Sequence, residues 1–391
     1  MPQFIPPKRL TVSPSLKNSE SHRVRVLQIG KFYPPHRGGM ESVLYDLCHV
    51  LKDKVDLGVL VANGQGGTCI ETKNGLKVVR VGSFGTIFST SICPSMACWI
   101  KRFRPDIVQI HHPNPMADIS YLLSNQPGKL VVLYQSDIVR QRITNMLYGP
   151  FLMRMLKKAH RIIVTSPNYL ASSPLLRRFE EKCVVIPLGI DLQKFDRTGC
   201  EKEIAAIRSR YGCGIVLFVG RLASYKGLPY LLEAMRKVSG QLLIIGRGKL
   251  ERDLRNYVER NTLSPKIHFL GELGEGEIVP LFHACDLLVL PSITRNEAFG
   301  VVQLEAMACG KPVVSTQLET GVPFVNQSGK TGIVVPPGDS EALAKAINLL
   351  LGDEKLRARM GIEGRKRVES QFTKENMGHE TLKLYEEILT N

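Results

Sequence analysis

The sequence has no long apolar run. Its 391 residues are 43% hydrophobic, yet no stretch approaches the ~18 uninterrupted apolar residues that a membrane-spanning helix needs. Residues 1–25 are polar and mixed in charge, without the apolar segment of a secretory signal. We therefore expect a cytoplasmic protein without a spanning helix, and a disordered tail over residues 1–21.

The cysteines show no paired spacing. None of the nine forms a CxxC pair or a metal-like cluster, which excludes a disulfide framework and a zinc ribbon and indicates reduced thiols. We expect no metal site.

Basic charge is confined to one half of the chain. Residues 1–195 contain 26 Lys+Arg and 12 Asp+Glu, net +14, whereas residues 196–391 contain 26 and 24, net +2. A basic half is compatible with nucleic acid, an anionic membrane surface or a phosphorylated substrate. Because no RNP, helix-turn-helix or zinc signature accompanies it, we expect no nucleic-acid partner.

Short apolar runs alternate with helix-compatible segments in both halves. This rhythm predicts two doubly wound, Rossmann-like α/β domains, 22–195 and 196–372, and a terminal helix over 373–391 that can pack back on the first domain. The expected strands are 24–30, 55–62, 106–112, 130–136, 161–166, 182–191, 214–222, 241–248, 266–273, 286–292, 311–316 and 331–339. Because such sheets bind ligands beyond the carboxyl ends of their strands, we expect the functional residues there, facing a cleft.

Two glycine-rich turns follow expected strands. "GRLASYKG" (220–227) places Arg221 and Lys226 beside glycines, which suits a diphosphate, although solvated cations in an ordinary turn would look the same. In "PHRGGMES" (35–42), Gly38 and Gly39 precede an expected helix and would let a phosphate or sugar approach the backbone. The alternative for this pair is a simple turn.

The stretch "EAFGVVQLEAMACGKPVV" (297–314) contains two separated carboxylates. We expect a helix over 298–308, with Glu297 at or before its start and Glu305 inside it. Glu297 is then either a ligand-binding residue or a helix cap. Glu305 lies among apolar residues, where a carboxylate needs a partner. Ribose hydroxyls or a neighbouring cation would provide one.

From residue 24 to about residue 388, the chain resembles the family 4 retaining glycosyltransferases of the GT-B fold. The matching motifs, in the family's order, are "GKFYPPHRGGME", "DIVQIHHPNP", "SDIVRQ", "VTSPNYL", "VIPLGID", "FVGRLASYKG", "EAFGVVQLEAMACGKPVV" and "TGIVVPPGD". "SDIVRQ", "SPNYLASSP" and "TGVPFVNQSGKTG" look like mannosyl- or rhamnosyltransferases of bacterial surface polysaccharide assembly.

The resemblance implies a role for each matching residue on the donor side. Glu305 would hold the nucleotide ribose, Glu297 the hydroxyls of the donor sugar, and the backbone at Phe299 and Gly300 would line the sugar site. Arg221 and Lys226 would neutralise the diphosphate and the leaving nucleotide. With those cations and no DxD motif, the resemblance implies no metal and no cofactor besides the nucleotide-sugar co-substrate.

On the acceptor side the chain departs from the family pattern. Gly38 and Gly39 would let the first domain approach the donor phosphates and the acceptor. Related sequences have His-Ser-Asp where this chain has Gln135, Ser136 and Asp137, and Gln135 cannot titrate. We expect Gln135 and Asp137 in the site, although Asp137 is also suited to capping a helix. His111 and His112 end a strand and are candidates for sugar or acceptor contact, or ordinary hydrogen-bonded histidines.

Residues 140–161 mix apolar side chains with Arg and Lys. They are compatible with an anionic bilayer surface or with a core-facing helix that has a solvated basic face. The family resemblance implies a lipid-linked saccharide acceptor for this half, and hence a peripheral location on the inner face of the cell membrane.

The sequence thus predicts a metal-independent retaining hexosyltransferase of polysaccharide biosynthesis, with GDP-mannose as the favoured donor. Two alternatives remain: a UDP-sugar-dependent transferase, and a non-catalytic nucleotide-sugar- or saccharide-binding relative, which the Gln135 substitution suggests.

Overall fold

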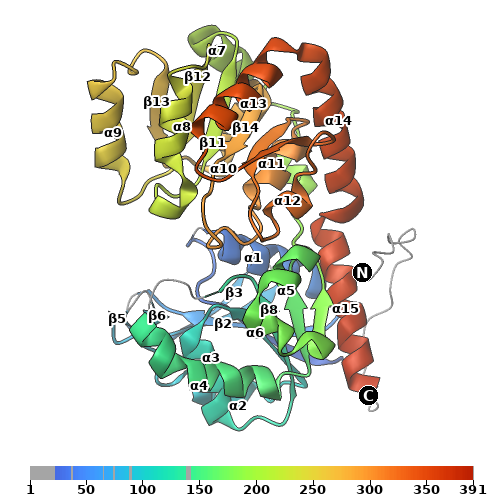
Figure 1. Cartoon of the computed structure of the whole chain (residues 1–391). Coiled ribbons are helices and arrows are strands. Elements are labelled where there is room, and N and C mark those ends of the chain that lie inside the picture. The colour runs from blue at the N-terminus through green and yellow to red at the C-terminus, as the bar shows by residue number, and fades with distance from the viewer. Residues whose placement is uncertain are drawn as a thin grey trace. The chain divides into compact units, whose positions relative to one another are not determined.

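The chain forms two compact units (Figure 1). A computed structural model describes residues 23–390 except 37, 65, 74, 88–89 and 138–141, with the backbone alone at 87, 142–147 and 275. Unit 1 comprises Met1–Gly189 and Lys374–Asn391, and unit 2 comprises Ile190–Thr373. The boundary between the two units thus lies between Gly189 and Ile190, whereas the expected domain boundary was at residue 195. The tail expected over residues 1–21 lies outside the described residues.

Unit 1 is built on an eight-stranded sheet with the order β10-β9-β8-β7-β1-β2-β4-β3. Its strands are β1 (Arg25–Ile29), β2 (Asp56–Ala62), β3 (Cys69–Lys73), β4 (Leu76–Val81), β7 (Ile107–His112), β8 (Lys129–Tyr134), β9 (Arg161–Val164) and β10 (Cys183–Val185). Only β3 pairs antiparallel within this sheet. β5 (Thr86–Ile87) and β6 (Thr90–Ser91) form a separate hairpin. The order along the chain reverses between β1 and β7, which makes their carboxyl ends the expected ligand site.

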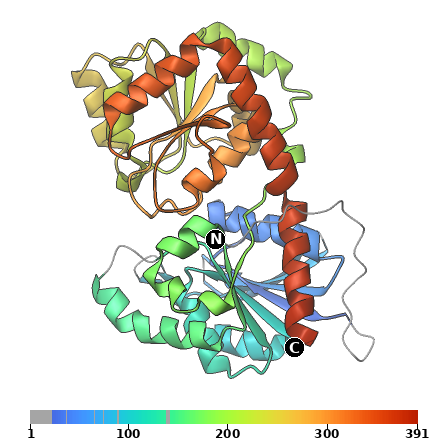
Figure 2. The ribbon, with the colours of Figure 1, turned by 45° about the vertical axis from the view of Figure 1, so that its right-hand side comes forward.

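Helices flank this sheet. They are α1 (Gly39–Leu51), α2 (Met96–Phe103), α3 (Pro115–Ser124), α4 (Arg142–Lys158), α5 (Pro167–Ser172), α6 (Pro174–Arg177), the 3-10 turn η1 (Glu180–Lys182) and α15 (Lys374–Thr390). The last helix packs against α1 (Figure 2). The contact is close at Gly378, where an added Cβ would lie 2.4 Å from Val50 Cγ1.

Unit 2 has a six-stranded parallel sheet with the order β13-β12-β11-β14-β15-β16. The strands are β11 (Ile215–Val219), β12 (Gln241–Ile245), β13 (Ile267–Gly271), β14 (Leu287–Leu290), β15 (Val313–Thr316) and β16 (Gly332–Val335). Every apolar run expected as a strand, in both units, contains one. The order reverses between β11 and β14. Two Rossmann-like sheets, one parallel throughout and the other parallel except at β3, confirm the expected α/β class.

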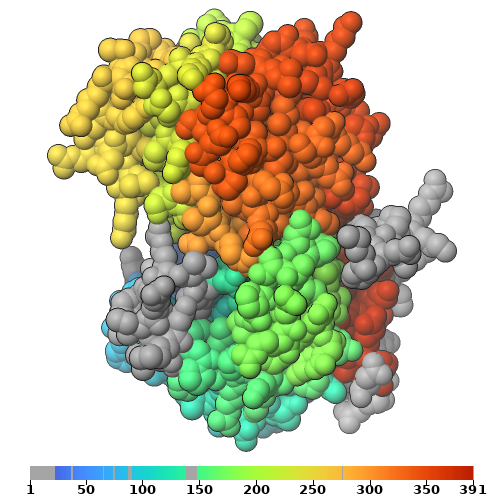
Figure 3. Space-filling view, viewed as in Figure 1, coloured from blue at the N-terminus to red at the C-terminus, as the bar shows by residue number. Residues whose placement is uncertain are grey.

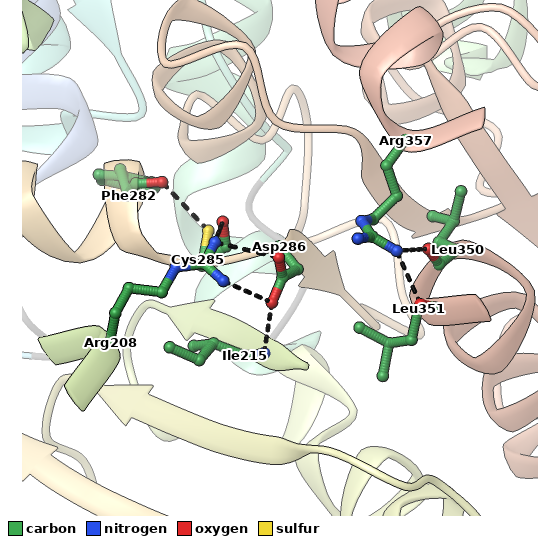
Figure 4. Close-up of polar contacts among 8 residues, drawn as sticks. All are labelled: Arg208, Ile215, Phe282, Cys285, Asp286, Leu350, Leu351 and Arg357. Atoms are coloured by element: carbon green, nitrogen blue, oxygen red, sulfur yellow. Dashed lines mark hydrogen bonds and ion pairs between the residues drawn. The ribbon is translucent and has the colours of Figure 1, made fainter. Parts of the chain in front are cut away.

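The helices of unit 2 cover both faces of its sheet. They are α7 (Glu201–Tyr211), α8 (Leu228–Met235), α9 (Glu251–Arg260), α10 (Glu275–Ala284), α11 (Val302–Ala308), α12 (Val322–Val325), α13 (Ser340–Gly352) and α14 (Glu354–Gln371), with 3-10 turns η2 (Leu192–Phe195) and η3 (Ser224–Lys226). At the amino ends of the central strands, Asp286 accepts hydrogen bonds from the Ile215 backbone N–H at 2.8 Å and from Arg208 Nη2 at 3.0 Å (Figure 4). Arg357 of α14 donates to the carbonyls of Leu350 and Leu351 at the end of α13 (Figure 4), which satisfies helix-terminal acceptors.

Candidate active site

Two loops meet where the strand order of unit 2 reverses. One follows β11 and contains Arg221 and Lys226; the other follows β14 and contains Ser292 and Glu297. Lys226 Nζ lies 2.6 Å from Glu297 Oε2, and Ser292 Oγ donates to the same oxygen at 2.8 Å. Two candidate residues from distant motifs, Lys226 and Glu297, are thus in direct contact at the position where α/β sheets bind ligands.

The ion pair of Lys226 and Glu297 is largely shielded from solvent, with each side chain 10% exposed. Burial by itself lowers the pKa of Lys226 because desolvation disfavours the ammonium, but the Glu297 carboxylate outweighs it and the pKa lies above the ordinary 10.5. Lys226 is therefore cationic at neutral pH. Arg221 is exposed, and among the described residues no side chain pairs with its guanidinium.

Glycines allow the two loops to approach each other. Gly227 has φ 68°, and an added Cβ would lie 2.0 Å from the Pro291 carbonyl oxygen. The Ile293 N–H donates to the Tyr225 carbonyl at 2.8 Å and joins the two loops beside the ion pair. Gly227 therefore lets the β11 loop hold Lys226 against the β14 loop, which no other residue type would allow without movement.

The helix expected over 298–308 is shorter than expected. α11 begins at Val302, and residues 297–300 are loop. Gly300 has φ 75°, a conformation that a right-handed helix excludes. Glu297 is therefore no helix cap, and its partners are Lys226 and Ser292 instead. The predicted helix start was wrong because spacing alone does not reveal the backbone conformation of a glycine.

Gln303 braces the loop that contains Phe299 and Gly300. Its Nε2 donates to the Phe299 carbonyl at 3.1 Å and to the Val322 carbonyl at 3.5 Å. The Phe299 ring is buried and lies edge-on to Phe372 with ring centroids 6.1 Å apart, so the Phe299 side chain anchors the loop and leaves the backbone for a ligand. Sequence reasoning missed Gln303 and Ser292. The only available signal was a polar residue within an otherwise apolar run.

Glu305 lies in α11 and is partly buried. α14 fixes this helix: an added Cβ on Gly361 would lie 2.0 Å from the Gly310 carbonyl oxygen, and Arg365 Nη1 donates to the Ala308 carbonyl at 2.8 Å. The rigid mounting suits a ligand-binding carboxylate. Glu305 thus lies in the helix between β14 and β15.

In unit 1, the Gly-Gly pair stands at the start of α1, which follows β1. An added Cβ on Gly38 would lie 2.3 Å from Glu41 Oε2, whereas no atom of the described residues lies within 4 Å of one on Gly39. Glu41 is in the first turn of α1, where a carboxylate is favoured by the helix dipole. An anion approaching this helix end would thus meet an acidic side chain beside Gly38 and open space beside Gly39.

Both strand-end histidines are enclosed by protein groups. His111 is 1% exposed and His112 0% exposed. His111 Nε2 lies 3.0 Å from Gln28 Oε1, and its Nδ1 lies 3.3 Å from Gln135 Nε2. Burial lowers the pKa of His111 to about 3. His112 Nδ1 lies 3.2 Å from Asp118 Oδ2. His111 is thus buried too deeply to contact a ligand directly, and it is linked to the edge of the sheet through its hydrogen bond with Gln135.

Asp137 is held at the end of β8 by two tyrosines. Its Oδ1 accepts from the Tyr134 hydroxyl at 2.9 Å, and its backbone N–H donates to the Tyr169 hydroxyl at 2.7 Å. Burial, and then the Asp137 carboxylate, raise the pKa of Tyr134 well above its ordinary value, so that hydroxyl remains a donor. The alternative of Asp137 as a helix cap concerns residues 138–141, which lie outside the described part of the chain.

The basic segment 140–161 contains α4, whose Leu152, Met155 and Leu156 are buried while Arg154, Lys157 and Lys158 are exposed. Part of this helix lies on the surface of unit 1 that Figure 3 draws. Phe151 is 45% exposed on the same helix. Arg140 and the side chain of Arg142 lie outside the described residues. The amphipathic pattern therefore gives a core-facing helix with a basic outer face and one exposed aromatic ring.

Across the residues that the structure describes, no helix is long and apolar enough to cross a membrane. All nine cysteines are free thiols. No group of three or more His, Cys, Asp or Glu side chains in the same described part is arranged to hold a metal ion.

Comparisons with known proteins agree on one family. Residues 37–194 match "Glycosyltransferase Family 4" and residues 201–367 match "Glycosyl transferases group 1". The chain is 34% identical to O-antigen chain mannosyltransferase C of Escherichia coli, over 94% of this chain and 99% of that protein. It is 33% identical to the D-rhamnosyltransferase WbpZ of Pseudomonas aeruginosa, over 90% of this chain and 92% of that protein.

Solved structures share the fold at lower identity. A sucrose-phosphate synthase of Thermosynechococcus elongatus has a TM-score of 0.77 at 21% identity, covering 94% of this chain and 99% of that one. The Anabaena protein HepE, solved in complex with UDP, has a TM-score of 0.74 at 19% identity and covers 93% and 100%. The chain is therefore a hexosyltransferase that belongs to glycosyltransferase family 4 and has the GT-B fold.

Proposed function

We propose that the enzyme moves a hexose, with mannose favoured, from a nucleotide sugar to a lipid-linked or saccharide acceptor in polysaccharide biosynthesis, with retention of the anomeric configuration. GDP-mannose is the favoured donor. The observation that carries this proposal is the buried contact of Lys226, Glu297 and Ser292 at the reversal in strand order. The likeness to an O-antigen mannosyltransferase and a D-rhamnosyltransferase supports the choice of sugar.

Glu297 is prepared to accept hydroxyl donors. Lys226 and Ser292 hold its Oε2, while within the described residues no group is bonded to its Oε1. The contacts at Oε2 also fix the position of Oε1, and a carboxylate oxygen is a strong hydrogen-bond acceptor. Oε1 would therefore accept hydrogen bonds from hydroxyls of the donor sugar. The backbone at Phe299 and Gly300, braced by Gln303, would line the same sugar.

Arg221 and Lys226 would bind the donor diphosphate. Negative charge grows on the leaving nucleotide as the glycosidic bond to it breaks, and two positioned cations can stabilise that transition state by several kcal/mol. The two cations would do without a metal. Glu305 would hold the ribose hydroxyls from the rigid helix α11. If this assignment is right, EDTA leaves the transfer rate unchanged, whereas Arg221→Ala lowers kcat by ~100-fold or more.

Unit 1 would bind the acceptor with the residues at the ends of β1 and β8. Gly39 offers open space, and Asp137 and Gln135 offer polar groups that their neighbours hold in place. The exposed Arg154, Lys157 and Phe151 of α4 would rest on an anionic membrane surface, where each cation contributes ~1 kcal/mol. This would put the enzyme at the inner face of the membrane beside a lipid-linked acceptor.

The donor is tested by thermal shift with GDP, UDP, ADP, GDP-mannose and UDP-glucose, followed by transfer assays with the donors that bind. A ligand specific for the native state stabilises it by ~2.7 kcal/mol at a hundredfold excess over its Kd. A response to GDP compounds alone supports GDP-mannose. A response to UDP compounds alone overturns the mannose assignment and keeps the transferase.

Membrane binding is tested by sedimentation with vesicles of phosphatidylcholine, with and without phosphatidylglycerol. The wild type should sediment with the anionic vesicles only, and less so as salt rises. Lys157→Glu combined with Lys158→Glu should abolish binding, whereas Lys202→Glu, an exposed charge reversal in unit 2, should not. Equal sedimentation of both variants would contradict the role of α4.

A further inference from the structure

One hydrogen-bond chain in unit 1 joins the last helix to the end of β8. It links Gln135 to His111 at 3.3 Å, His111 to Gln28 at 3.0 Å, Gln28 to Tyr385 at 2.8 Å, and Tyr385 to Gln109 at 2.7 Å. All five side chains are buried, and Gln28, Gln109 and Tyr385 are 0% exposed. A polar chain of this length in a core is costly unless its members satisfy one another.

The chain runs in one direction. The Tyr385 hydroxyl has a single proton and donates it to Gln109 Oε1, and it accepts from Gln28 Nε2. Gln28 Oε1 can then only accept, so His111 Nε2 carries the ring proton. The His111 ring is neutral because burial lowers its pKa to about 3. Its Nδ1 is therefore an acceptor, and Gln135 Nε2 donates to it.

This direction determines which atom of the Gln135 amide faces away from His111 and is available to a ligand. One of the two amide N–H groups donates to His111, and within the described residues no group donates to Gln135 Oε1. A glutamine amide could otherwise turn by 180° and present N–H groups instead. The hydrogen-bond network holds the Gln135 amide in one orientation, with its carbonyl oxygen available at the carboxyl edge of the sheet.

We propose that Tyr385 is a positioning residue for hexosyl transfer, which fixes the tautomer of His111 and thereby the orientation of the Gln135 amide. The Gln135 carbonyl oxygen is then held in one position as an acceptor, so it selects a substrate with a hydroxyl at that point over one with a fluorine or methoxy group there. This inference rests on the proposed function, because the hydroxyl would belong to the hexose or the saccharide acceptor.

The first test needs no substrate. In protein labelled with 15N in the histidine rings, His111 should show a protonated Nε2 and an unprotonated Nδ1, assigned by comparison with His111→Phe. Tyr385→Phe should produce a mixture of both tautomers. Gln109→Leu should favour the protonated Nδ1, because Tyr385 is then free to donate to Gln28. A protonated Nδ1 in the wild type, or an unchanged tautomer in both variants, overturns the proposal.

The second test is a kinetic double-mutant cycle. Tyr385→Phe should lower kcat/KM for transfer by ~5- to 30-fold, as expected for one misplaced hydrogen bond, and should have less than ~2-fold effect when Gln135 is already Leu. Equal losses in both backgrounds would show that Tyr385 does not act through Gln135. Thr381→Val is the matched control, because it removes a buried hydroxyl from the same helix that, among the described residues, donates to the Met377 carbonyl and has no other partner; its kcat/KM should equal that of the wild type.

The two tests separate this inference from the function on which it rests. If the wild type transfers no hexose from any donor, the proposed function fails, while the His111 tautomer still decides the direction of the chain. If transfer proceeds and the cycle is additive, the function stands and the positioning role of Tyr385 is lost.

Discussion

Replacing Glu297 by Gln should destabilise unit 2, because it leaves Lys226 as a buried ammonium without its counter-ion. The two charged atoms are 2.6 Å apart and each side chain is 10% exposed. Removing one partner of a buried ion pair costs ~3–5 kcal/mol. Ser292 remains beside the amide and some solvent reaches the site, so we expect a loss of about 3 kcal/mol in the free energy of unfolding at pH 7. Lys226→Met should cost a similar amount.

The sign of the pH dependence follows from the pKa of Lys226. In the wild type this pKa lies above 10.5, so the pair stabilises the fold fully below pH 10.5 and loses its contribution only as the pH rises through the folded-state pKa. In Glu297→Gln the carboxylate that raises the pKa of Lys226 is gone, and burial, which is the largest influence, depresses this pKa below that of the unfolded chain. The deficit of the variant should therefore shrink between pH 7 and pH 10.

The assay is urea unfolding followed by far-UV circular dichroism at both pH values. Trp99, the sole tryptophan, lies in unit 1 and reports that unit separately by fluorescence. The double variant of Lys226→Met and Glu297→Gln should be more stable than either single variant, because no charge is left buried. Glu319→Gln, at an 83% exposed partner of Arg295, is the control and should stay within ~0.5 kcal/mol of the wild type. Strictly additive losses, or a deficit that is the same at both pH values, would refute the reasoning.

Three further substitutions test the framework around this pair. Gly227→Ala should cost at least ~2 kcal/mol in urea unfolding, because its Cβ would collide with the Pro291 carbonyl at a positive φ, whereas Gly276→Ala, exposed in α10 with no neighbour within 4 Å, should raise stability by up to ~1 kcal/mol; similar effects at both sites would contradict the steric argument. Asp286→Asn should cost ~1–2 kcal/mol by the same measurement, since it weakens charge-assisted bonds to the Ile215 N–H and to Arg208, and an unchanged midpoint would show that these bonds contribute nothing. Glu305→Ala should weaken nucleotide binding in calorimetry by ~10- to 100-fold while Glu297→Ala mainly lowers kcat, and the assignment fails if the two variants change the same parameter equally.

The strands were predictable because most are buried on both faces. In β11, β12 and β14 nearly every residue is apolar, and such runs bounded by glycine or proline indicate a parallel sheet. β3 and β4 were not predicted: the residues of β3 are mostly exposed and polar, and the apolar run of β4 is interrupted by Lys77 and Arg80. The antiparallel pairing of β3 with β4 depends on an adjacent strand rather than on the composition of β3.

The site was predictable residue by residue but not as a geometry. Lys226 and Glu297 were candidates from their motifs, yet their contact requires β11 and β14 to be neighbours, which follows from the strand order and not from local sequence. The burial of His111 could not be predicted from the local sequence either, because residues at a strand end usually face solvent. Its partner Gln28 donates a hydrogen bond to Tyr385, 357 positions away in the sequence. No local sequence pattern predicts a contact between residues so far apart.

The return of α15 to unit 1 has a consequence for biosynthesis. Unit 1 consists of two segments, and everything in unit 2 lies between them. During translation all of unit 2 leaves the ribosome before Tyr385 does, so the core around Gln28 and Gln109 stays incomplete until the residues after unit 2 have been synthesised. The later unit is thus able to mature first, against the usual amino-to-carboxyl order. A nascent chain stalled with residues 1–373 outside the ribosome should resist protease in unit 2 and remain sensitive in unit 1, and equal protection of both would show that unit 1 closes without its last helix.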